Sequence, residues 1–206
     1  MHKINRKQYE RLVRKKEILE AALALFAEKD FHEVTVDEIA ERVGLSKGTL
    51  YLYFENKESL FFSIIQEKTD ALFNRLQAVA KKEAPFIERL EEFIRSYLGF
   101  FDEHKHYFKI VHCEKSRMDK HYTDRLKAHM IKSFDDFEEM MQAFIIEGQI
   151  QKILRSIRPD LMTKALRGLL NSFTFQCIFL NSECSLENET PHVMDLFLNG
   201  VKAHDE

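Results

Sequence analysis

The 206-residue chain contains no tryptophan, only three prolines and only six glycines. Proline and glycine mark turns, and no part of the sequence alternates apolar and polar residues as a half-buried strand does. This scarcity argues for long helices and against a β-rich fold. The 45% hydrophobic content, with 18 phenylalanines, still provides a large apolar interior. We therefore expect an all-helical protein.

Long apolar runs are also missing. No stretch approaches the roughly 20 uncharged apolar residues of a membrane-spanning helix, and residues 1–16 lack the apolar core of a signal peptide. The three cysteines, Cys113, Cys177 and Cys184, are an odd number without CxxC spacing. That pattern favours free thiols in a cytoplasmic protein. We expect a cytoplasmic location and no membrane partner.

Catalytic motifs are absent as well. The chain has no P-loop, GxGxxG, HExxH or GxSxG motif, so we expect neither an enzyme nor a cofactor. Residues 104–121 contain several histidines beside Cys113, which raises the question of a metal site. The neighbours His112 and Cys113 would point apart on a helix, and His104 and His106 would not share a face. We therefore predict no metal site.

Positive charge is concentrated at one end. The formal net charge is −3, but residues 1–16 hold seven basic residues against Glu10 and carry +6, so the other 190 residues carry −9. A basic end on an acidic body fits a surface that faces DNA. A solvated, frayed N-terminus is the alternative.

Residues 35–57, TVDEIAERVGLSKGTLYLYFENK, contain a series of helix start and stop signals. Thr35 and Glu38 can form a capping box, and Gly44 can take the left-handed conformation that ends a helix. Ser46 can cap a second helix, expected over residues 47–54, and Asn56 can cap a third. Two short helices joined by a tight turn predict a helix-turn-helix that reads DNA.

The outer face of the second helix supports that prediction. Leu50 and Phe54 would face inward, which leaves a polar and aromatic set outside. Glycine lets the backbone approach DNA, threonine offers a hydroxyl and a methyl group, and tyrosines can donate to phosphates. Lys57 would add its charge to a helix N-terminus and make a phosphate site. A helix-turn-helix that serves only as a scaffold is the alternative.

The segments 35–40, 43–51, 53–54 and 56–60 closely resemble the DNA-binding domain of the TetR/AcrR family of bacterial transcriptional regulators, and residues 18–26 resemble its first helix. The likeness covers roughly residues 14–65 and is specific there. Leu52 cannot donate a hydrogen bond, so we expect only an apolar or sugar contact from it. Carried over position by position, the resemblance implies operator contacts by Thr35, Lys47, Gly48, Thr49, Tyr51, Leu52, Tyr53 and Lys57.

The remaining chain predicts further helices, whose starts are marked by prolines or caps. Gly148 is the expected C-cap of one of them, and residues 181–188 form a polar loop. Together with the N-terminal segment this gives about nine helices, the number in the resembled family. We predict a DNA-binding domain over 1–57 and an effector-binding and dimerisation domain over 58–206. The helices are expected over 56–81, 85–101, 106–115, 119–147, 159–181 and 190–203.

Two late segments predict a homodimer. Residues 169–180 are apolar nearly all round, as in a helix buried on several sides. The last helix carries its own stripe of Val193, Leu196, Phe197, Gly200 and Val201. The resemblance implies that these helices from two subunits form a four-helix interface, and two half-sites on DNA need such a two-fold protein. One large monomeric core is the alternative.

Aromatic and methionine side chains crowd three neighbouring helices of the body, and such residues form adaptable apolar cavities. The resemblance implies an effector pocket there, although each residue alone also fits a plain core. A fatty acyl chain or its CoA ester suits this composition, with aromatic compounds or cationic drugs as alternatives. A cation would use Glu114 or Asp119. The predicted lining residues are Phe93, Tyr97, Phe101, Phe108, Met118, Phe134, Phe137, Met141 and Phe173.

The sequence thus predicts a ligand-responsive repressor that binds a palindromic DNA operator as a homodimer and is released by a small apolar effector. An activator of the same fold, a helical binding protein without an operator, and a helical enzyme acting on an apolar substrate are the alternatives.

Overall fold

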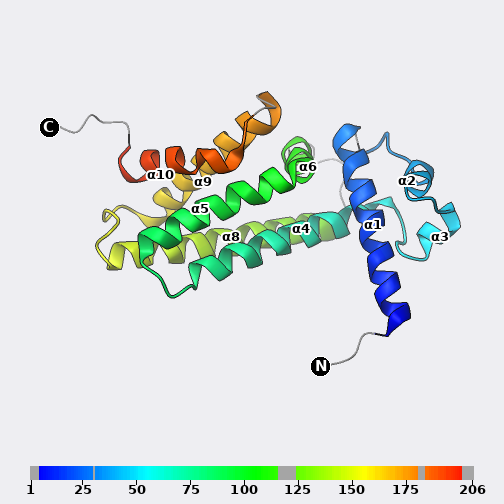
Figure 1. The fold of residues 1–206 in the computed structure, drawn as a ribbon, viewed down its shortest axis with the longest axis horizontal. Helices are drawn as coiled ribbons and strands as arrows, with labels where there is room; N and C mark the ends of the chain where they lie inside the picture. The colour runs from blue at the N-terminus through cyan, green and yellow to red at the C-terminus, as the bar shows by residue number, and fades with distance from the viewer. Residues whose placement is uncertain (1–4, 30, 116–123, 181–183, 201–206) are drawn as a thin grey trace. The chain divides into compact units, whose positions relative to one another are not determined.

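The computed structural model describes residues 5–29, 31–115, 124–180 and 184–200, with the backbone alone for 113–115, 124–127, 129 and 130. This part of the chain contains nine α-helices and no strand, which confirms the all-helical prediction (Figure 1). The helices are α1 (Arg6–Glu28), α2 (Val36–Arg42), α3 (Lys47–Tyr51), α4 (Lys57–Ala80), α5 (Phe86–Glu103), α6 (Lys105–Lys115), α8 (Asp124–Ile150), α9 (Pro159–Phe175), the π-helix η1 (Gln176–Leu180), the 3-10 helix η2 (Leu186–Glu189) and α10 (Thr190–Leu198).

The chain divides into two compact units. The first unit comprises residues 1–68 and 106–127, and the second comprises residues 69–105 and 128–206. α4 therefore begins in the first unit and ends in the second. The functional boundary between residues 57 and 58 stays a prediction.

Three phenylalanine rings form the centre of the first unit. The ring centroids of Phe26, Phe31 and Phe61 lie 5.1 to 5.4 Å apart. Ile39 of α2 and Leu50 of α3 are almost fully buried as well. α3 thus buries Leu50, leaves Lys47 and Tyr51 exposed, and holds Thr49 half-buried.

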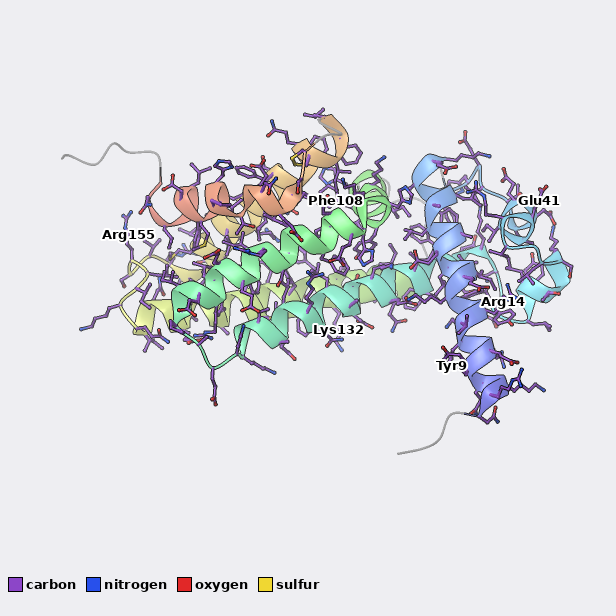
Figure 2. All side chains as sticks on the ribbon, viewed as in Figure 1. Tyr9, Arg14, Glu41, Phe108, Lys132 and Arg155 are labelled. Carbon is purple, nitrogen blue, oxygen red and sulfur yellow. A yellow bond between two sulfur atoms is a disulfide. The ribbon has the colours of Figure 1, made fainter. Side chains whose placement is uncertain are left out.

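α1 begins earlier than the family-like run 18–26 suggested. Asn5 Oδ1 accepts from the Gln8 N–H at 2.9 Å, and Gln8 Oε1 accepts from the Asn5 N–H at 3.1 Å, so the helix starts with a capping box. Arg6 also pairs with Glu10 at 2.8 Å. From Arg6 onwards the basic segment is therefore helical, and Tyr9 and Arg14 project from it (Figure 2).

In the second unit, α5 packs with one side fully buried, and Arg89 fixes its start. Arg89 is 5% exposed and donates to the carbonyls of Ala80 at 2.6 Å and Ala84 at 3.1 Å. It also forms an ion pair with Glu147 of α8. One side chain thus satisfies the last carbonyl of α4 and a carbonyl of the loop that follows, and it attaches α8 to the first turns of α5.

The prediction of a C-cap at Gly148 is wrong. α8 continues to Ile150, and the left-handed residue beyond it is Lys152, with φ of 58°. Gly148 lies instead at a close approach to α5, where an added Cβ would stand 2.5 Å from Phe86 Cζ. Glycine is needed there for space, not for backbone conformation.

The end of the chain departs from the prediction in two places. The α-helix that starts at Pro159 as expected becomes the π-helix η1 at Gln176, and the expected polar loop 181–188 contains η2. Cys177 and Cys184 form a disulfide, so the prediction of free thiols is wrong for both. The Cys113 side chain lies outside the described residues.

None of the described helices combines the length and the apolar character that crossing a bilayer requires.

Candidate DNA-binding surface and effector cavity

The helix-turn-helix begins with the predicted capping box. Thr35 Oγ1 accepts from the Glu38 N–H at 3.2 Å, and Glu38 Oε2 accepts from the Thr35 N–H at 2.8 Å. Lys29 Nζ donates to the other Glu38 carboxylate oxygen at 2.6 Å. The hydrogen bond from Lys29, followed by those from Thr35, lowers the pKa of the Glu38 carboxyl to about 2. The start of α2 is therefore held by an ionised carboxylate.

The turn and the second cap also follow the prediction. Gly44 has φ of 66°, and Ser46 Oγ accepts from the Thr49 N–H at 3.2 Å. α3 is shorter than the expected 47–54, because its last turn tightens as the Leu52 N–H bonds to the Thr49 carbonyl at 3.1 Å. Asn56 Oδ1 then caps α4 by accepting from the Ser59 N–H at 2.7 Å.

The predicted DNA-contact residues lie on one short segment with unequal exposure. Tyr51 is 45% exposed and Leu52 is 72% exposed, whereas Thr49 and Tyr53 are half-buried. Thr35, Lys47 and Gly48 are exposed. Leu52, directly after α3, thus presents an apolar side chain on the predicted DNA-contact segment.

Lys47 is held by a neighbour on α2. Its Nζ donates to Asp37 Oδ2 at 2.7 Å, and both side chains are at least half exposed to solvent. The hydrogen bond to Asp37 raises the pKa of the Lys47 ammonium, which stays charged. An exposed pair of this kind contributes about 0–1 kcal/mol, so a phosphate or a base edge can replace the carboxylate.

Lys57 has more partners than the sequence suggested. Its Nζ donates to the carbonyls of Phe31 at 2.6 Å and Val34 at 2.8 Å, and it lies 4.4 Å from the centroid of the Phe31 ring. This ammonium fixes the segment before α2 against the first turn of α4. A phosphate contact by Lys57 stays a prediction and has to compete with these carbonyls.

Two basic residues of α1 reach the end of α3, a contact that sequence reasoning missed. Arg11 Nη2 donates to the Leu52 carbonyl at 3.2 Å, and the Arg11 guanidinium lies 5.8 Å from the centroid of the Tyr53 ring. Lys15 Nζ lies 5.6 Å from the centroid of the Phe54 ring. The only sequence signal was the cluster of positive charge.

The structure separates the predicted effector residues into several groups. Phe93, Tyr97, Phe101 and Met141 are buried in the second unit. Phe137 and Phe173 are half-buried there, and Phe134 is 44% exposed. Phe108 belongs to the first unit, where its ring stacks on His112 at 5.4 Å. Met118 lies outside the described residues.

The buried members pack against one another. The ring of Tyr97 lies 4.9 Å from Phe101 and 6.4 Å from Phe137. Tyr97 Oη donates to Asn171 Oδ1 at 2.9 Å, a polar contact in this apolar surrounding that sequence reasoning did not identify. In this conformation the rings form a packed core, and a ligand would have to displace them.

A groove of about 450 Å³ lies beside this core. None of the nine predicted lining residues borders it, although its own Met140 and Phe144 are of the residue types expected for a pocket. Phe144 also stacks on Phe93 with ring centroids 5.5 Å apart, so one ring separates the groove from the interior. The groove is lined by Phe73, Gln77, Ala80, Lys81, Asp136, Glu139, Met140, Ala143, Phe144 and Glu147.

Both parts of the chain match known protein families. The family model "Bacterial regulatory proteins, tetR family" matches residues 18–64, and "Tetracyclin repressor-like, C-terminal domain" matches residues 83–174. Two family models thus cover the helix-turn-helix and most of the helices that follow it.

Three known proteins illustrate the similarity. The nucleoid occlusion factor SlmA of Marinomonas sp. (strain MWYL1) is 25% identical over 142 residues, 69% of this chain and 71% of that protein. The fatty acid metabolism regulator protein of Bacillus subtilis (strain 168) is 36% identical over 74 residues, 36% of this chain and 38% of that protein. The crystal structure of the transcriptional regulator FadR from Bacillus subtilis in complex with stearoyl-CoA shares the fold, with a TM-score of 0.76, 21% identity, and coverage of 91% of this chain and 99% of that one.

Both family models describe TetR-type transcriptional regulators, which are non-enzymatic DNA-binding proteins. The chain is a transcriptional regulator and belongs to the TetR family of bacterial regulatory proteins.

Proposed function

We propose that this regulator represses transcription by binding a palindromic DNA operator as a homodimer, and that a small apolar effector releases it. The observation that carries this proposal is the exposed set on α3 and the turn that follows it, fixed in place by the caps at Thr35, Ser46 and Asn56. A rigid, exposed helix of this kind is what major-groove recognition requires.

The proposed DNA contacts fall into two groups, those to base edges and those to the sugar-phosphate backbone. Lys47, Thr49 and Tyr51 read base edges, and Gly48 allows the backbone to approach. Leu52 makes an apolar contact with a sugar or a thymine methyl. Thr35, Tyr53 and Lys57 contact the phosphate backbone, which supplies affinity and salt dependence.

The basic part of α1 adds phosphate contacts beside the recognition segment. Arg11 and Lys15 connect it to Leu52 and Phe54, so its charges belong to the same surface of the first unit. Phosphates would also offset the unfavourable interaction of basic residues with the positive end of a helix.

Partly exposed apolar side chains at the end of the chain support the homodimer. Leu180 is 73% exposed, and Phe173, Ile178 and Phe197 are half-buried. Packing α9 and α10 of two subunits together would cover them and place two recognition helices for two half-sites.

For the effector we propose a fatty acyl chain, free or as its CoA ester. Two similar proteins support this class, namely a fatty acid metabolism regulator and the FadR protein in complex with stearoyl-CoA. The acyl chain would enter at the groove and displace the Phe144 ring from the Phe93 ring. Effector binding would favour a spacing of the two recognition helices that no longer fits the operator, which requires tighter binding to that state.

The charge of the groove supports a second effector class, a cationic amphiphile. Asp136, Glu139 and Glu147 line it against one lysine, Lys81, and Glu147 is already paired with Arg89. Such a rim attracts an ammonium group and repels the phosphates of CoA.

A regulator that binds an operator on bacterial DNA would act in the cytoplasm. An activator with the same fold, or a helical binding protein without an operator, are the rival functions.

The test is selection of the protein's binding sites from random DNA, followed by fluorescence anisotropy on the selected site. We expect a palindrome and a steep fall of affinity with salt. Stearic acid, stearoyl-CoA and a quaternary ammonium amphiphile are then added separately. The compound that dissociates the protein from the DNA identifies the effector class. In vitro transcription separates repression from activation. Failure to enrich any site would overturn operator binding.

A further inference from the structure

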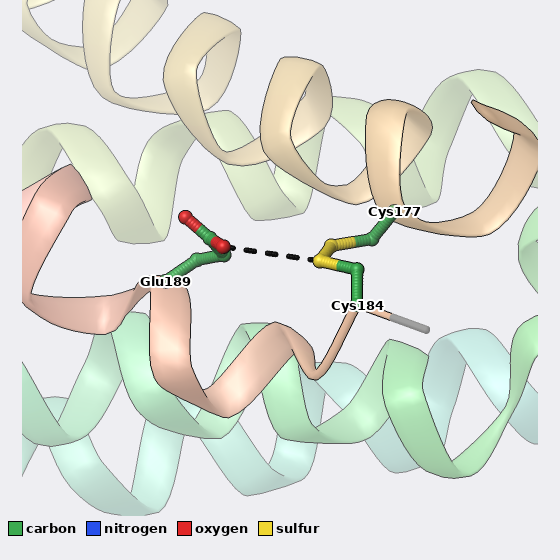
Figure 3. Close-up of side chains that lie close together, drawn as sticks. All are labelled: Cys177, Cys184 and Glu189. Atoms are coloured by element: carbon green, nitrogen blue, oxygen red, sulfur yellow. Dashed lines mark hydrogen bonds between the residues drawn. A yellow bond between two sulfur atoms is a disulfide. The ribbon is translucent and has the colours of Figure 1, made fainter. Parts of the chain in front are cut away.

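The disulfide Cys177–Cys184 connects the end of α9 to the helices that follow. Cys177 lies in η1, and Cys184 lies two residues before η2, with the two Cα atoms 5.2 Å apart (Figure 3). The bond closes a short loop, because the cysteines are separated by only seven positions. It therefore acts locally, at the connection between α9 and α10.

The two sulfur atoms differ in accessibility. Cys177 is 6% exposed, whereas Cys184 is half-buried. An incoming thiol therefore reaches the Cys184 sulfur first. Glu189 Oε1 lies 3.8 Å from that sulfur, and the other oxygen of Glu189 lies 3.0 Å from His192 Nδ1.

The bridge holds residues that matter for packing. Beyond Cys184, Leu186, Thr190 and Val193 are almost completely buried. Glu187 of η2 lies against Gly99 of α5, where an added Cβ would stand 3.2 Å from Glu187 Oε1. The disulfide thus anchors the start of α10 to the end of α9. On the α9 side the anchor is a π-turn, a less stable form of helix often found at functional positions.

We propose that Cys177 and Cys184 form a reversible thiol–disulfide switch that exchanges with low-molecular-weight thiols and sets the stability of the α9–α10 pair. The link to regulation rests on the proposed function, in which these helices form the dimer interface and the protein acts in the cytoplasm. Disulfides in that compartment are usually transient and redox-sensing, because its thiol pool reduces them.

The exchange proceeds in two balanced steps. The thiolate of a small thiol attacks Cys184 Sγ, a mixed disulfide forms, and Cys177 leaves with the bonding electron pair and takes a proton. A second small thiol attacks the sulfur of the first small thiol in the mixed disulfide. This step releases the disulfide of the two small molecules and leaves Cys184 as a thiol. The protein gains two electrons and two protons, and two small thiols are oxidised. In the reverse direction, the small-molecule disulfide oxidises the two cysteines and re-forms the bridge.

The same three side chains also place potential metal ligands within 4.8 Å of one another, namely Cys177, Cys184 and Glu189. Sulfur atoms bonded to each other are not thiolate ligands, so metal binding would compete with the bridge. For that reason every buffer in the test contains EDTA.

The test uses the full-length protein in glutathione buffers of defined ratio. Alkylation and peptide mass spectrometry report the state of each cysteine, thermal unfolding reports Tm, and sedimentation reports the dimer dissociation constant. We expect reduction to lower Tm by about 5–10 °C, since opening the loop returns conformational entropy to the unfolded chain. The dimer dissociation constant should rise about tenfold.

Variants separate the bridge from general thiol effects. In both buffers, Cys184→Ser should show the Tm and the dimer dissociation constant of the reduced protein. Cys177→Ala, which removes the other sulfur of the bond, should give the same result. Cys113→Ser should respond to glutathione as the native chain does.

Three outcomes would overturn the switch. These are alkylation of Cys177 and Cys184 in oxidised glutathione, resistance of the bridge to reduced glutathione, and equal Tm and dimerisation in both states. The proposed function fails separately. If no operator is bound in either buffer while Tm and dimerisation follow the redox state, the repressor proposal is wrong and the switch stands.

Discussion

Lys47 Nζ on the first residue of α3 donates to Asp37 Oδ2 in the first turn of α2 at 2.7 Å. The two helices of the helix-turn-helix are thus joined by an exposed ion pair at the surface proposed to meet DNA. Since the carboxylate repels phosphates and occupies the lysine, it opposes binding while it holds Lys47 in place.

Asp37→Asn should therefore strengthen operator binding. The variant releases Lys47 and removes one negative charge, so we expect about three- to tenfold tighter binding at about 50 mM salt and a smaller gain at about 200 mM. Anisotropy titrations measure both. Glu41→Gln, at another exposed carboxylate of α2, makes the same charge change without touching Lys47. Equal gains in affinity for the two variants would mean that the change in net charge, and not the release of Lys47, strengthens binding.

Lys57→Met should lower stability as well as DNA affinity. It keeps the apolar part of the side chain but leaves the carbonyls of Phe31 and Val34 without their donor, at about 1–3 kcal/mol. Urea unfolding and the salt dependence of operator binding distinguish two roles. A direct phosphate contact predicts a salt slope smaller by about 0.9 in addition to the loss of stability. A purely structural role predicts lower stability with an unchanged slope.

Tyr51→Ala should weaken operator binding at least about tenfold without changing Tm, because a side chain with 45% exposure contributes little to the core. Dimerisation and effector binding should stay as they are. Tyr51→Phe separates the hydroxyl from the ring. If Tyr51→Ala lowers Tm strongly, the assignment of this residue to the DNA surface is wrong.

The capping box predicts a pH dependence. The folded pKa of Glu38 is about 2, below its ordinary value of 4.5, because the ionised carboxylate receives hydrogen bonds from Lys29 and Thr35. This stabilisation is fully present above pH 4.5 and is lost as the pH falls from 4.5 towards 2. Glu38→Gln keeps the capping geometry but loses the charge. The Tm difference between native chain and variant should be clear at neutral pH and shrink in acid, and a difference independent of pH would contradict the assignment.

Local chemistry explains which parts of the fold were predictable. The caps at Thr35, Ser46 and Asn56 and the turn at Gly44 depend on residues three or four positions apart, so the sequence displays each of them. The partners of Lys57 lie 26 and 23 positions earlier, and nothing in the local pattern indicates them.

The effector residues illustrate a different limit. Aromatic composition located an apolar body, but a core ring and a pocket ring have the same composition. Phe93 of α5 is fully packed, whereas Phe144 of α8, which stacks on it, borders both the groove and the core. Only the packing of α8 beside the end of α4 makes this distinction. The pairing of Cys177 with Cys184 is likewise set by the π-turn and η2, neither of which was predicted.

Gly148→Ala tests the close approach of α8 to Phe86 of α5. Its Cβ would stand 2.5 Å from Phe86 Cζ and 2.8 Å from Leu154 Cδ1, and both partners are buried, so relief requires movement of the core. We expect a loss of about 1–3 kcal/mol in the free energy of unfolding. Gly168→Ala is the matched control, since its Cβ meets nothing within 4 Å and helix propensity favours alanine by about 1 kcal/mol. Phe86→Leu combined with Gly148→Ala should recover part of the loss in a double-mutant cycle. A Gly148→Ala protein as stable as the native chain would show that α5 and α8 do not approach this closely in solution.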